Sequence, residues 1–284
     1  MNRFLLRWGA SLLLAGLTGA AAAQSVLRIS AAPDGRTPEQ QAEQFEPLGE
    51  YLSKRLKTRA QWVPFKTEAQ LSAALLARKV DLAWIPAGTL VMLQAQAPGQ
   101  VLPLVQRDED ARSRSVIVVR ADSALRKPQD LKGRTLGFGP VSSAAAHLMP
   151  RAALLAARIE PGRDLKVSHA QSEDAVLQAL QAGQVDAAAF SQATWEGWSA
   201  AARVDARQWR VLMSTEPRAD RSLSVRGDFG EGHRNAIAAA FLALEAVPGG
   251  KDILRSHGTR RFVLAPPEAF DPVRDAARQA GLIR

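Results

Sequence analysis

The chain has 284 residues, a formal net charge of +9, 46% hydrophobic residues and no cysteine. A charged fraction of 23% together with abundant Leu, Val and Ala makes the chain too apolar to be intrinsically disordered, and the length accommodates two compact lobes. The absence of cysteine excludes disulfides, thiolate catalysis, zinc ribbons and iron–sulfur clusters, so any chemistry must use oxygen, imidazole or backbone groups.

The first 23 residues have the pattern of a secretory signal peptide. Two arginines precede an apolar run at 8–19, and small residues follow at 20–23. The apolar run is about a dozen residues long, whereas a membrane-spanning helix needs roughly 20. We therefore expect cleavage near Ala23 and a soluble mature protein outside the cytoplasm.

The positive net charge does not by itself predict a nucleic-acid partner. The basic residues are scattered, and the densest cluster, at 54–59, falls at the end of a predicted helix. Cations at that position complement the helix dipole. We expect no binding to nucleic acid.

Hydrophobic periodicity predicts strands that alternate with helices. In the first half, strands are expected at 27–31, 61–65, 81–85, 101–105 and 115–120, and helices at 38–57, 68–78 and 89–96. In the second half, strands are expected at 135–139, 165–169, 186–190 and 209–214, and helices at 143–158, 173–182, 234–245, 251–257 and 267–280. The alternation indicates an α/β fold with parallel sheets and helices on both faces.

A short internal repeat supports two similar halves. Residues 74–83 and 179–188 are identical at six of ten positions, and both lead from an amphipathic helix into a strand that begins Val-Asp. Chance similarity in an alanine-rich chain remains the alternative.

The chain has no Pro/Gly/Ser-rich linker, which suggests that it crosses between the lobes twice. The expected crossings are 115–122 and 212–226, with lobe 1 formed by 24–116 and 222–284 and lobe 2 by 117–221. Such a bilobal body binds its ligand in the cleft between the lobes and closes by hinge motion.

Several stretches point to one family by their order and spacing: 27–34, 45–52, 80–84, 130–135, 138–143, 183–189 and 270–274. They resemble the phosphate/phosphite/phosphonate-type substrate-binding proteins of ABC transporters, the PhnD-like family, over nearly all of the mature chain. The resemblance implies a type II periplasmic-binding fold. It also implies a periplasmic protein without catalysis that delivers a small solute to a membrane permease. We expect a monomer without a cofactor.

The resemblance further implies a ligand site at the start of the helix predicted at 143–158. Family members place a Ser-Thr-Ser run there, but only Ser143 matches, because Ala144 and Ala145 follow. The unsatisfied N–H groups of a helix start can still bind an anion.

Other ligand positions of the family fall on residues with a changed charge. Glu68 and Ser113 stand in place of tyrosines, Glu173 stands in place of a histidine, and Asp220 is retained. The loss of donors predicts a ligand that is less anionic than a phosphonate, such as a zwitterion or an amine-bearing solute. Because Glu68 and Glu173 begin predicted helices, capping remains an alternative to ligand contact for both.

If the three carboxylates Glu68, Glu173 and Asp220 face one cavity, a cation must balance them. Arg36 and Arg218 are the nearest candidates along the chain. Trp195 follows the predicted strand at 186–190, where ligand loops of α/β proteins gather, so it is either a core residue or a stacking contact for the ligand.

No catalytic or metal-binding pattern stands out. Ser143 and His147 have the spacing of one helix face, but no nucleophile elbow surrounds Ser143 and nothing orients His147. The four histidines lack metal-ligand spacing. A sensory accessory protein for a membrane receptor kinase remains an alternative to transport. An enzyme on the same fold is disfavoured by the export signal and by the missing catalytic constellation.

Overall fold

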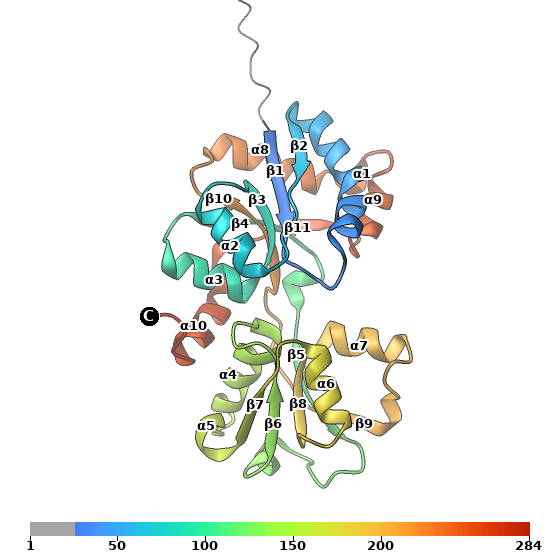
Figure 1. The fold of residues 1–284 in the computed structure, drawn as a ribbon, viewed down its shortest axis with the longest axis vertical. Coiled ribbons are helices and arrows are strands. Elements are labelled where there is room, and N and C mark those ends of the chain that lie inside the picture. Colours follow the sequence, from blue (N-terminus) through green and yellow to red (C-terminus); the bar gives the residue numbers. More distant parts are fainter. Residues whose placement is uncertain (1–25) are drawn as a thin grey trace, which may run out of the picture.

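Two β-sheets organise the chain, and each forms the centre of one lobe (Figure 1). The structure is a computed structural model that describes residues 26–284, so the expected signal peptide at 1–23 lies outside the described residues. Within that range, no helix is both long enough and apolar enough to cross a bilayer. We call the six-stranded sheet with its helices lobe 1, and the five-stranded sheet with its helices lobe 2.

Lobe 1 contains both ends of the described chain. Its strands are β1 (Val26–Ala31), β2 (Arg59–Trp62), β3 (Leu82–Pro86), β4 (Val101–Arg107), β10 (Arg221–Arg226) and β11 (Phe262–Leu264). Its helices are α1 (Pro38–Leu56), α2 (Glu68–Leu76), α3 (Ala87–Gln96), α8 (Glu231–Leu242), α9 (Gly250–Ser256) and α10 (Asp271–Gln279). The strand order is β11-β4-β10-β3-β1-β2, in which β1 runs parallel to β2 and β3 and the other pairs are antiparallel. Helices α1, α8 and α9 cover one face, and α2, α3 and α10 cover the other.

Lobe 2 repeats this plan on a smaller scale. Its strands are β5 (Ser115–Arg120), β6 (Thr135–Phe138), β7 (Lys166–His169), β8 (Ala187–Ser191) and β9 (Trp209–Ser214). Its helices are α4 (Met149–Ala156), α5 (Pro161–Asp164), α6 (Glu173–Gln181) and α7 (Gln192–Ala200), with a π-helical turn at Ala144–Leu148 before α4. The strand order is β7-β6-β8-β5-β9, in which β6 is parallel to β7 and β8 and β5 is antiparallel to β8 and β9.

Helix α1 shows how local sequence sets an element. The Thr37 hydroxyl accepts a hydrogen bond from Gln40 N at 3.2 Å, and the Gln40 side chain accepts one from Thr37 N at 2.9 Å. This capping box, with Pro38 in the first turn, satisfies donors that a helix start otherwise leaves free. The apolar spacing that predicted the helix is confirmed, because Phe45 and Leu52 are buried in the core beneath it.

The sequence analysis did not predict β10, β11, α7 or the four-residue helix α5. Strand β10 carries Ser222 and Ser224, which are fully buried and hydrogen-bonded to each other at 2.9 Å, so its pattern does not look apolar. Strand β11 has only three residues, and α7 contains two tryptophans and a glycine, which are weak helix formers. The helix expected at 143–158 is divided into the π-helical turn and α4.

Two short segments, 108–114 and 215–220, join the sheets. They pair with each other, since Ser113 N donates to Arg218 O at 3.0 Å and Arg218 N donates to Ser113 O at 2.9 Å. The first segment precedes the crossing expected at 115–122, which is wrong because β5 is a strand of the lobe 2 sheet. The second segment is the middle part of the crossing expected at 212–226, whose ends belong to β9 and β10. A paired two-segment connection is the form that a hinge between lobes takes.

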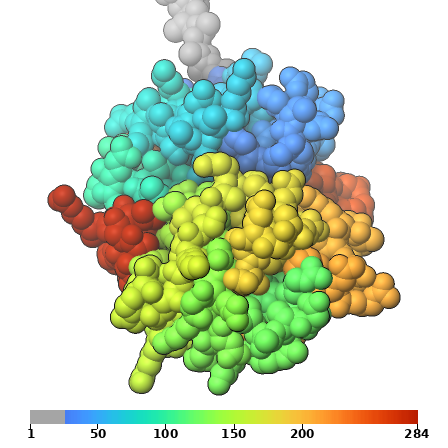
Figure 2. All heavy atoms as spheres, turned by 60° about the horizontal axis from the view of Figure 1, so that its bottom comes forward, coloured from blue at the N-terminus to red at the C-terminus, as the bar shows by residue number. Residues whose placement is uncertain are grey.

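The C-terminal helix α10 contacts both lobes. Its Val273 and Ala277 share one apolar cluster with Leu90 of α3 and with Ala144 and Leu148 of lobe 2. Figure 2 shows the lobes in contact and the C-terminal segment beside both. The core on this side of the molecule therefore extends from one lobe into the other.

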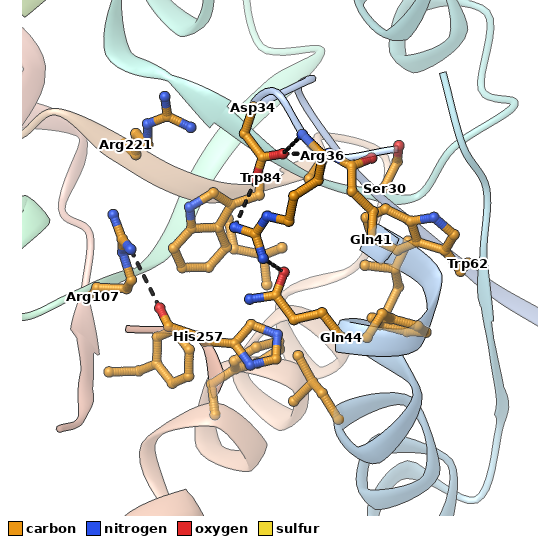
Figure 3. Close-up of a pocket in the computed structure, with 17 residues that line it drawn as sticks. Ser30, Asp34, Arg36, Gln41, Gln44, Trp62, Trp84, Arg107, Arg221 and His257 are labelled. Carbon is orange, nitrogen blue, oxygen red and sulfur yellow. Dashed lines mark hydrogen bonds and ion pairs between the residues drawn. The ribbon is translucent and has the colours of Figure 1, made fainter. Parts of the chain in front are cut away.

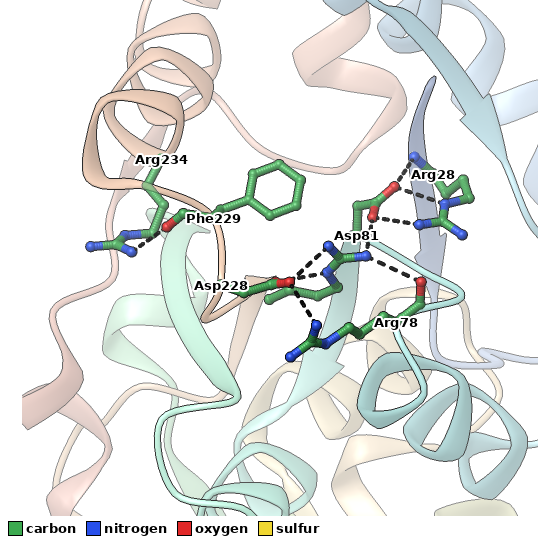
Figure 4. A network of polar contacts seen from close by, with 7 residues as sticks. Arg28, Arg78, Asp81, Asp228, Phe229 and Arg234 are labelled. Carbon is green, nitrogen blue, oxygen red and sulfur yellow. Dashed lines mark hydrogen bonds and ion pairs between the residues drawn. The ribbon is translucent and has the colours of Figure 1, made fainter. Parts of the chain in front are cut away.

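An ion-pair network around the buried Asp81 closes the far end of the lobe 1 sheet (Figure 4). Asp81, which is 3% exposed, accepts hydrogen bonds from Arg28 N, Nε and Nη2 at 2.8, 2.9 and 2.8 Å. Arg226 Nη1 donates to the same carboxylate at 2.8 Å and its Nε pairs with Asp228 at 3.0 Å. The network joins β1, β3 and β10, and each charge has a partner, as a buried carboxylate requires.

Candidate functional site

The internal repeat places an acidic residue at the same point of each lobe. Glu68 begins α2 and its carboxylate accepts a hydrogen bond from the Thr89 hydroxyl of α3. Glu173 begins α6 and its carboxylate accepts one from the Thr194 hydroxyl of α7 at 2.9 Å and another from Ser191 N. Each carboxylate therefore binds groups at the start of the next helix, α3 or α7. The sequence analysis considered capping only for the helix that each acid begins.

The Glu173 carboxyl group is partly buried, and the charges of Asp220 and Arg221 influence its pKa. Burial raises the pKa of the Glu173 carboxyl group above its ordinary value, although the hydrogen bonds from Ser191 and Thr194 act in the opposite direction. The negative charge of Asp220 raises this pKa further, and the positive charge of Arg221 lowers it. Glu173 of lobe 2 thus lies within electrostatic reach of the returning segment of the hinge.

Asp220 is paired rather than free. Arg218 Nη1 donates to its carboxylate at 2.9 Å, and Arg218 Nη2 donates to the Ser115 hydroxyl at 3.0 Å. The Asp220 carbonyl accepts a hydrogen bond from Ala87 N, the first residue of α3, at 2.6 Å. Ser113 lies in the hinge itself, opposite Arg218. Of the two arginines expected to neutralise the carboxylates, Arg218 is therefore engaged with Asp220.

The helix start at Ser143 lies against lobe 1. The Ser143 hydroxyl accepts a hydrogen bond from Ala146 N at 3.0 Å, and Ala144 and Ala145 are buried. The backbone of Gly88 in α3 packs so closely on the preceding loop that an added Cβ atom would lie 1.9 Å from Ser142 O. Only a glycine fits this contact between the lobes.

We call this region the seam; it comprises Gly88, Ser142, Ser143, Ala144, Glu173 and Asp220. The seam joins the N-terminal ends of α3 and of the π-helical turn, where backbone N–H groups lack intrahelical partners. Such a place favours polar or anionic groups.

Trp195 is part of the lobe 2 core. Its ring stacks on Phe190 with centroids 5.6 Å apart, and the side chain is 8% exposed. Of the two roles considered for Trp195, a core residue or a stacking contact for the ligand, the structure agrees with the core residue, whose stacking partner is Phe190.

A separate cavity of about 130 Å³ lies inside lobe 1 beneath the loop from β1 to α1 (Figure 3). Polar residues at its wall include Ser30, Asp34, Arg36, Arg107 and Arg221. None of the eight residues expected at the ligand site lines it: Glu68, Ser113, Ser143, Ala144, Ala145, Glu173, Trp195 and Asp220.

The sequence analysis did not identify most of the residues that line this cavity. The lining residues come from several strands and helices of lobe 1, so no local motif joins them. Arg36 had been considered as a neutralising cation, and it pairs with Asp34 at 2.7 Å rather than with the seam carboxylates. Among the described residues, no cluster of three or more His, Cys, Asp or Glu side chains is arranged to hold a metal ion.

The chain is similar to known proteins over most of its length. The family model "ABC transporter, phosphonate, periplasmic substrate-binding protein" matches residues 31–270. A probable ABC transporter phosphite binding protein, PhnD1 of Prochlorococcus marinus (strain MIT 9301), is 24% identical over 272 residues, which are 91% of each chain.

Solved structures share the fold. The structure of PhnD1 from Prochlorococcus marinus in complex with methylphosphonate has a TM-score of 0.74 at 24% identity and covers 92% of this chain and 100% of that one. XAC2383 from Xanthomonas citri bound to ATP has a TM-score of 0.75 at 20% identity, covering 90% and 98%. The periplasmic aliphatic sulphonate binding protein SsuA from Escherichia coli has a TM-score of 0.67 at 17% identity, covering 91% and 94%.

These matches confirm the type II periplasmic-binding fold with its two α/β lobes. Two of these relatives, PhnD1 and SsuA, are named as a phosphite binding protein and a sulphonate binding protein. A family match over residues 31–270, together with two lobes that meet at a hinge and a seam, leads to one conclusion: the chain belongs to the periplasmic substrate-binding proteins of phosphonate ABC transporters.

Proposed function

We propose that the mature protein, cleaved near Ala23, acts as a monomer in the periplasm and captures a small polar solute at the seam. The solute bridges the lobes, its contacts to each lobe favour the closed form, and an ABC permease receives the loaded protein. The observation that carries this proposal is the contact of Gly88 with Ser142, because it brings two helix starts from different lobes together.

We propose further that the solute carries less negative charge than a doubly charged phosphonate. Asp220 is neutralised by Arg218, and Arg221 opposes Glu173, so the seam has no excess of cations to balance a dianion. Donors for one anionic group come from the Ser143 hydroxyl and from the N–H groups at the start of the π-helical turn. A zwitterion or a monoanion fits this balance.

Calorimetric titration tests the proposal. We expect 2-aminoethylphosphonate or taurine, which are zwitterions, to bind wild-type protein more tightly than methylphosphonate does. Ser143→Pro should weaken binding far more than Ser143→Ala, because proline removes the N–H that donates to Pro140 O at 2.8 Å and alters the backbone of the helix start.

Thr37→Ala is the matched control, because Thr37 caps helix α1 in the same way but is not part of the seam. It should leave affinity unchanged. Equal and negligible effects of both Ser143 variants would remove this helix start from the site. Tight binding of methylphosphonate alone would contradict the proposed charge of the solute.

A further inference from the structure

We propose that the cavity in lobe 1 is a second binding site, separate from the seam, for a small organic monoanion with an apolar body, such as an aromatic carboxylate. The cavity volume of about 130 Å³ is close to that of cavities that hold one benzene ring. Its wall is largely aromatic: Phe45 and Trp62 have centroids 5.1 Å apart, and Trp84 and Phe262 have centroids 5.6 Å apart.

One hydrogen-bond donor in the wall has no partner. Trp62 Nε1 is buried, and it makes no hydrogen bond with another described residue. Ser30 also lines the cavity, but its side chain alternates with that of Ile29 and belongs to the other face of the sheet, like its strand neighbour Ala83. A buried donor without an acceptor is rare because it loses its bonds to water. An acceptor group inside the cavity would satisfy Trp62 Nε1.

The charged groups at the wall are mostly positive. Arg36, Arg107 and Arg221 line the cavity, and Asp34 is the one acidic residue among the described residues that do so. Arg107 is held by Asp110 at 2.6 Å, whereas the Arg221 side chain has no hydrogen bond or ion pair with any other described residue. Arg36 and Arg107 are each paired with a carboxylate, whereas the charge of Arg221 is offset only at longer range, by Asp110 and Glu173. Positive charge therefore predominates at the wall, which favours an anion.

The pKa of His257, which also lines the cavity, responds to the same arginines. Burial lowers the pKa of its imidazole, and the positive charges of Arg36 and Arg107 lower it further, although a hydrogen bond to Ile253 O acts in the opposite direction. The imidazole is thus kept neutral at the wall, and the arginines supply the charge.

The Asp34 carboxylate already forms the ion pair with Arg36 that we propose for the bound anion. The pair has an N–O distance of 2.7 Å, and Arg36 also donates to the Gln44 side chain of α1. Figure 3 shows Arg36 lying between Trp84 and Trp62, in the middle of the lining residues. An incoming carboxylate can replace Asp34 on Arg36 while its ring packs among the aromatic side chains. Asp34 consequently competes with the ligand.

The test is calorimetric titration with benzoate, followed in parallel by tryptophan fluorescence. Benzyl alcohol and benzylamine serve as neutral and cationic probes of similar shape. We expect benzoate to bind, benzyl alcohol to bind about tenfold more weakly and benzylamine not to bind. Arg36→Gln should weaken benzoate binding about tenfold, and Asp34→Asn should strengthen it several-fold.

Arg207→Gln and Asp205→Asn are matched controls, because this exposed pair of lobe 2 has an N–O distance of 3.0 Å and is remote from the cavity. Both should bind benzoate as the wild type does. Ser143→Pro should also leave benzoate binding unchanged, which separates this site from the seam.

The absence of heat and of fluorescence change at about 10 mM benzoate would overturn the proposal. Binding that is lost in Ser143→Pro but kept in Arg36→Gln would overturn it as well, since the ligand would then occupy the seam. If Arg36→Gln fails to fold, a crystal structure of the wild type with benzoate decides the matter. A ring between Trp62 and Trp84 supports the site, and a ring elsewhere refutes it.

Discussion

Glu173 of lobe 2 accepts a hydrogen bond from Thr194, and Glu68 of lobe 1 accepts the equivalent bond from Thr89, in each case 21 residues further along the chain. The ten-residue repeat is thus part of a longer structural unit. It includes Asp81 and Asp186, which accept backbone hydrogen bonds from the neighbouring strand, from Arg28 N and Thr135 N, at 2.8 Å each. The same unit, used twice, builds the parallel part of both sheets.

The first prediction concerns the role of Glu173. Because burial raises the pKa of its carboxyl group, folding disfavours the charged form, and an uncharged amide can take its place. Glu173→Gln should change the free energy of unfolding by less than about 0.5 kcal/mol, whereas Glu173→Ala should lower it by about 1–2 kcal/mol, because Ser191 N loses its acceptor.

Urea denaturation measures both effects, and the exposed Glu196→Ala, on α7, is the control with little expected change. A Glu173→Gln variant of unchanged stability that binds 2-aminoethylphosphonate more weakly would indicate ligand contact in addition to capping. Equal losses of stability in both Glu173 variants would contradict the capping role.

The second prediction concerns closure at the seam. Gly88→Ala would place a Cβ atom 1.9 Å from Ser142 O, so the two lobes must separate locally. We expect a larger radius of gyration by small-angle scattering and weaker solute binding. Gly197→Ala in α7, where a Cβ atom meets nothing within 4 Å, should instead stabilise the protein by about 0.5–1 kcal/mol through helix propensity. Unchanged scattering and affinity in Gly88→Ala would argue against closure at this contact.

The third prediction compares the two aspartates of the repeat. Asp81→Asn should cost about 1.5–3 kcal/mol, because Arg28 and Arg226 both lose charge-assisted hydrogen bonds to this carboxylate, while Asp228 still pairs with Arg226. Asp186→Asn should cost about 1 kcal/mol, since Asp186 is exposed and its hydrogen bond among the described residues comes from Thr135 N. Chemical denaturation of both variants gives the comparison, and similar losses would refute it.

The fourth prediction concerns pH and His147. Burial lowers the pKa of this imidazole, His169 and Arg151 lower it further, and the hydrogen bond to Val141 O partly offsets the shift. The folded protein therefore favours neutral His147. The associated stability is present above the unfolded value, about pH 6.5, and is lost as the pH falls toward the lower folded value.

Thermal unfolding at several pH values between about 7 and 5 should show this loss for the wild type and a shallower slope for His147→Gln. His233→Gln, at an exposed position of α8, should keep the wild-type slope. Identical slopes in all three proteins would contradict the assignment.

Local sequence determined most of the secondary structure and the two-lobe α/β plan. The apolar spacing of α1 and its cap at Thr37 depend on neighbours within one or two helical turns, so they can be read without the fold. The Val-Asp repeat likewise signals its helix–turn–strand unit directly. Strand β10 was missed because its serines are buried by packing against β3 and β4, which the sequence does not reveal.

Tertiary structure decided the chemistry of the sites. The sequence placed acids at helix starts, but whether Glu68 and Glu173 meet a ligand or a threonine of the next helix depends on how consecutive helices are set on the sheet. Arg36, Trp62 and Arg221 come from separate segments, and only the folding of lobe 1 brings them around one cavity. The physical reason is range: backbone conformation responds to near neighbours in the chain, whereas side-chain partners are chosen by packing between distant segments.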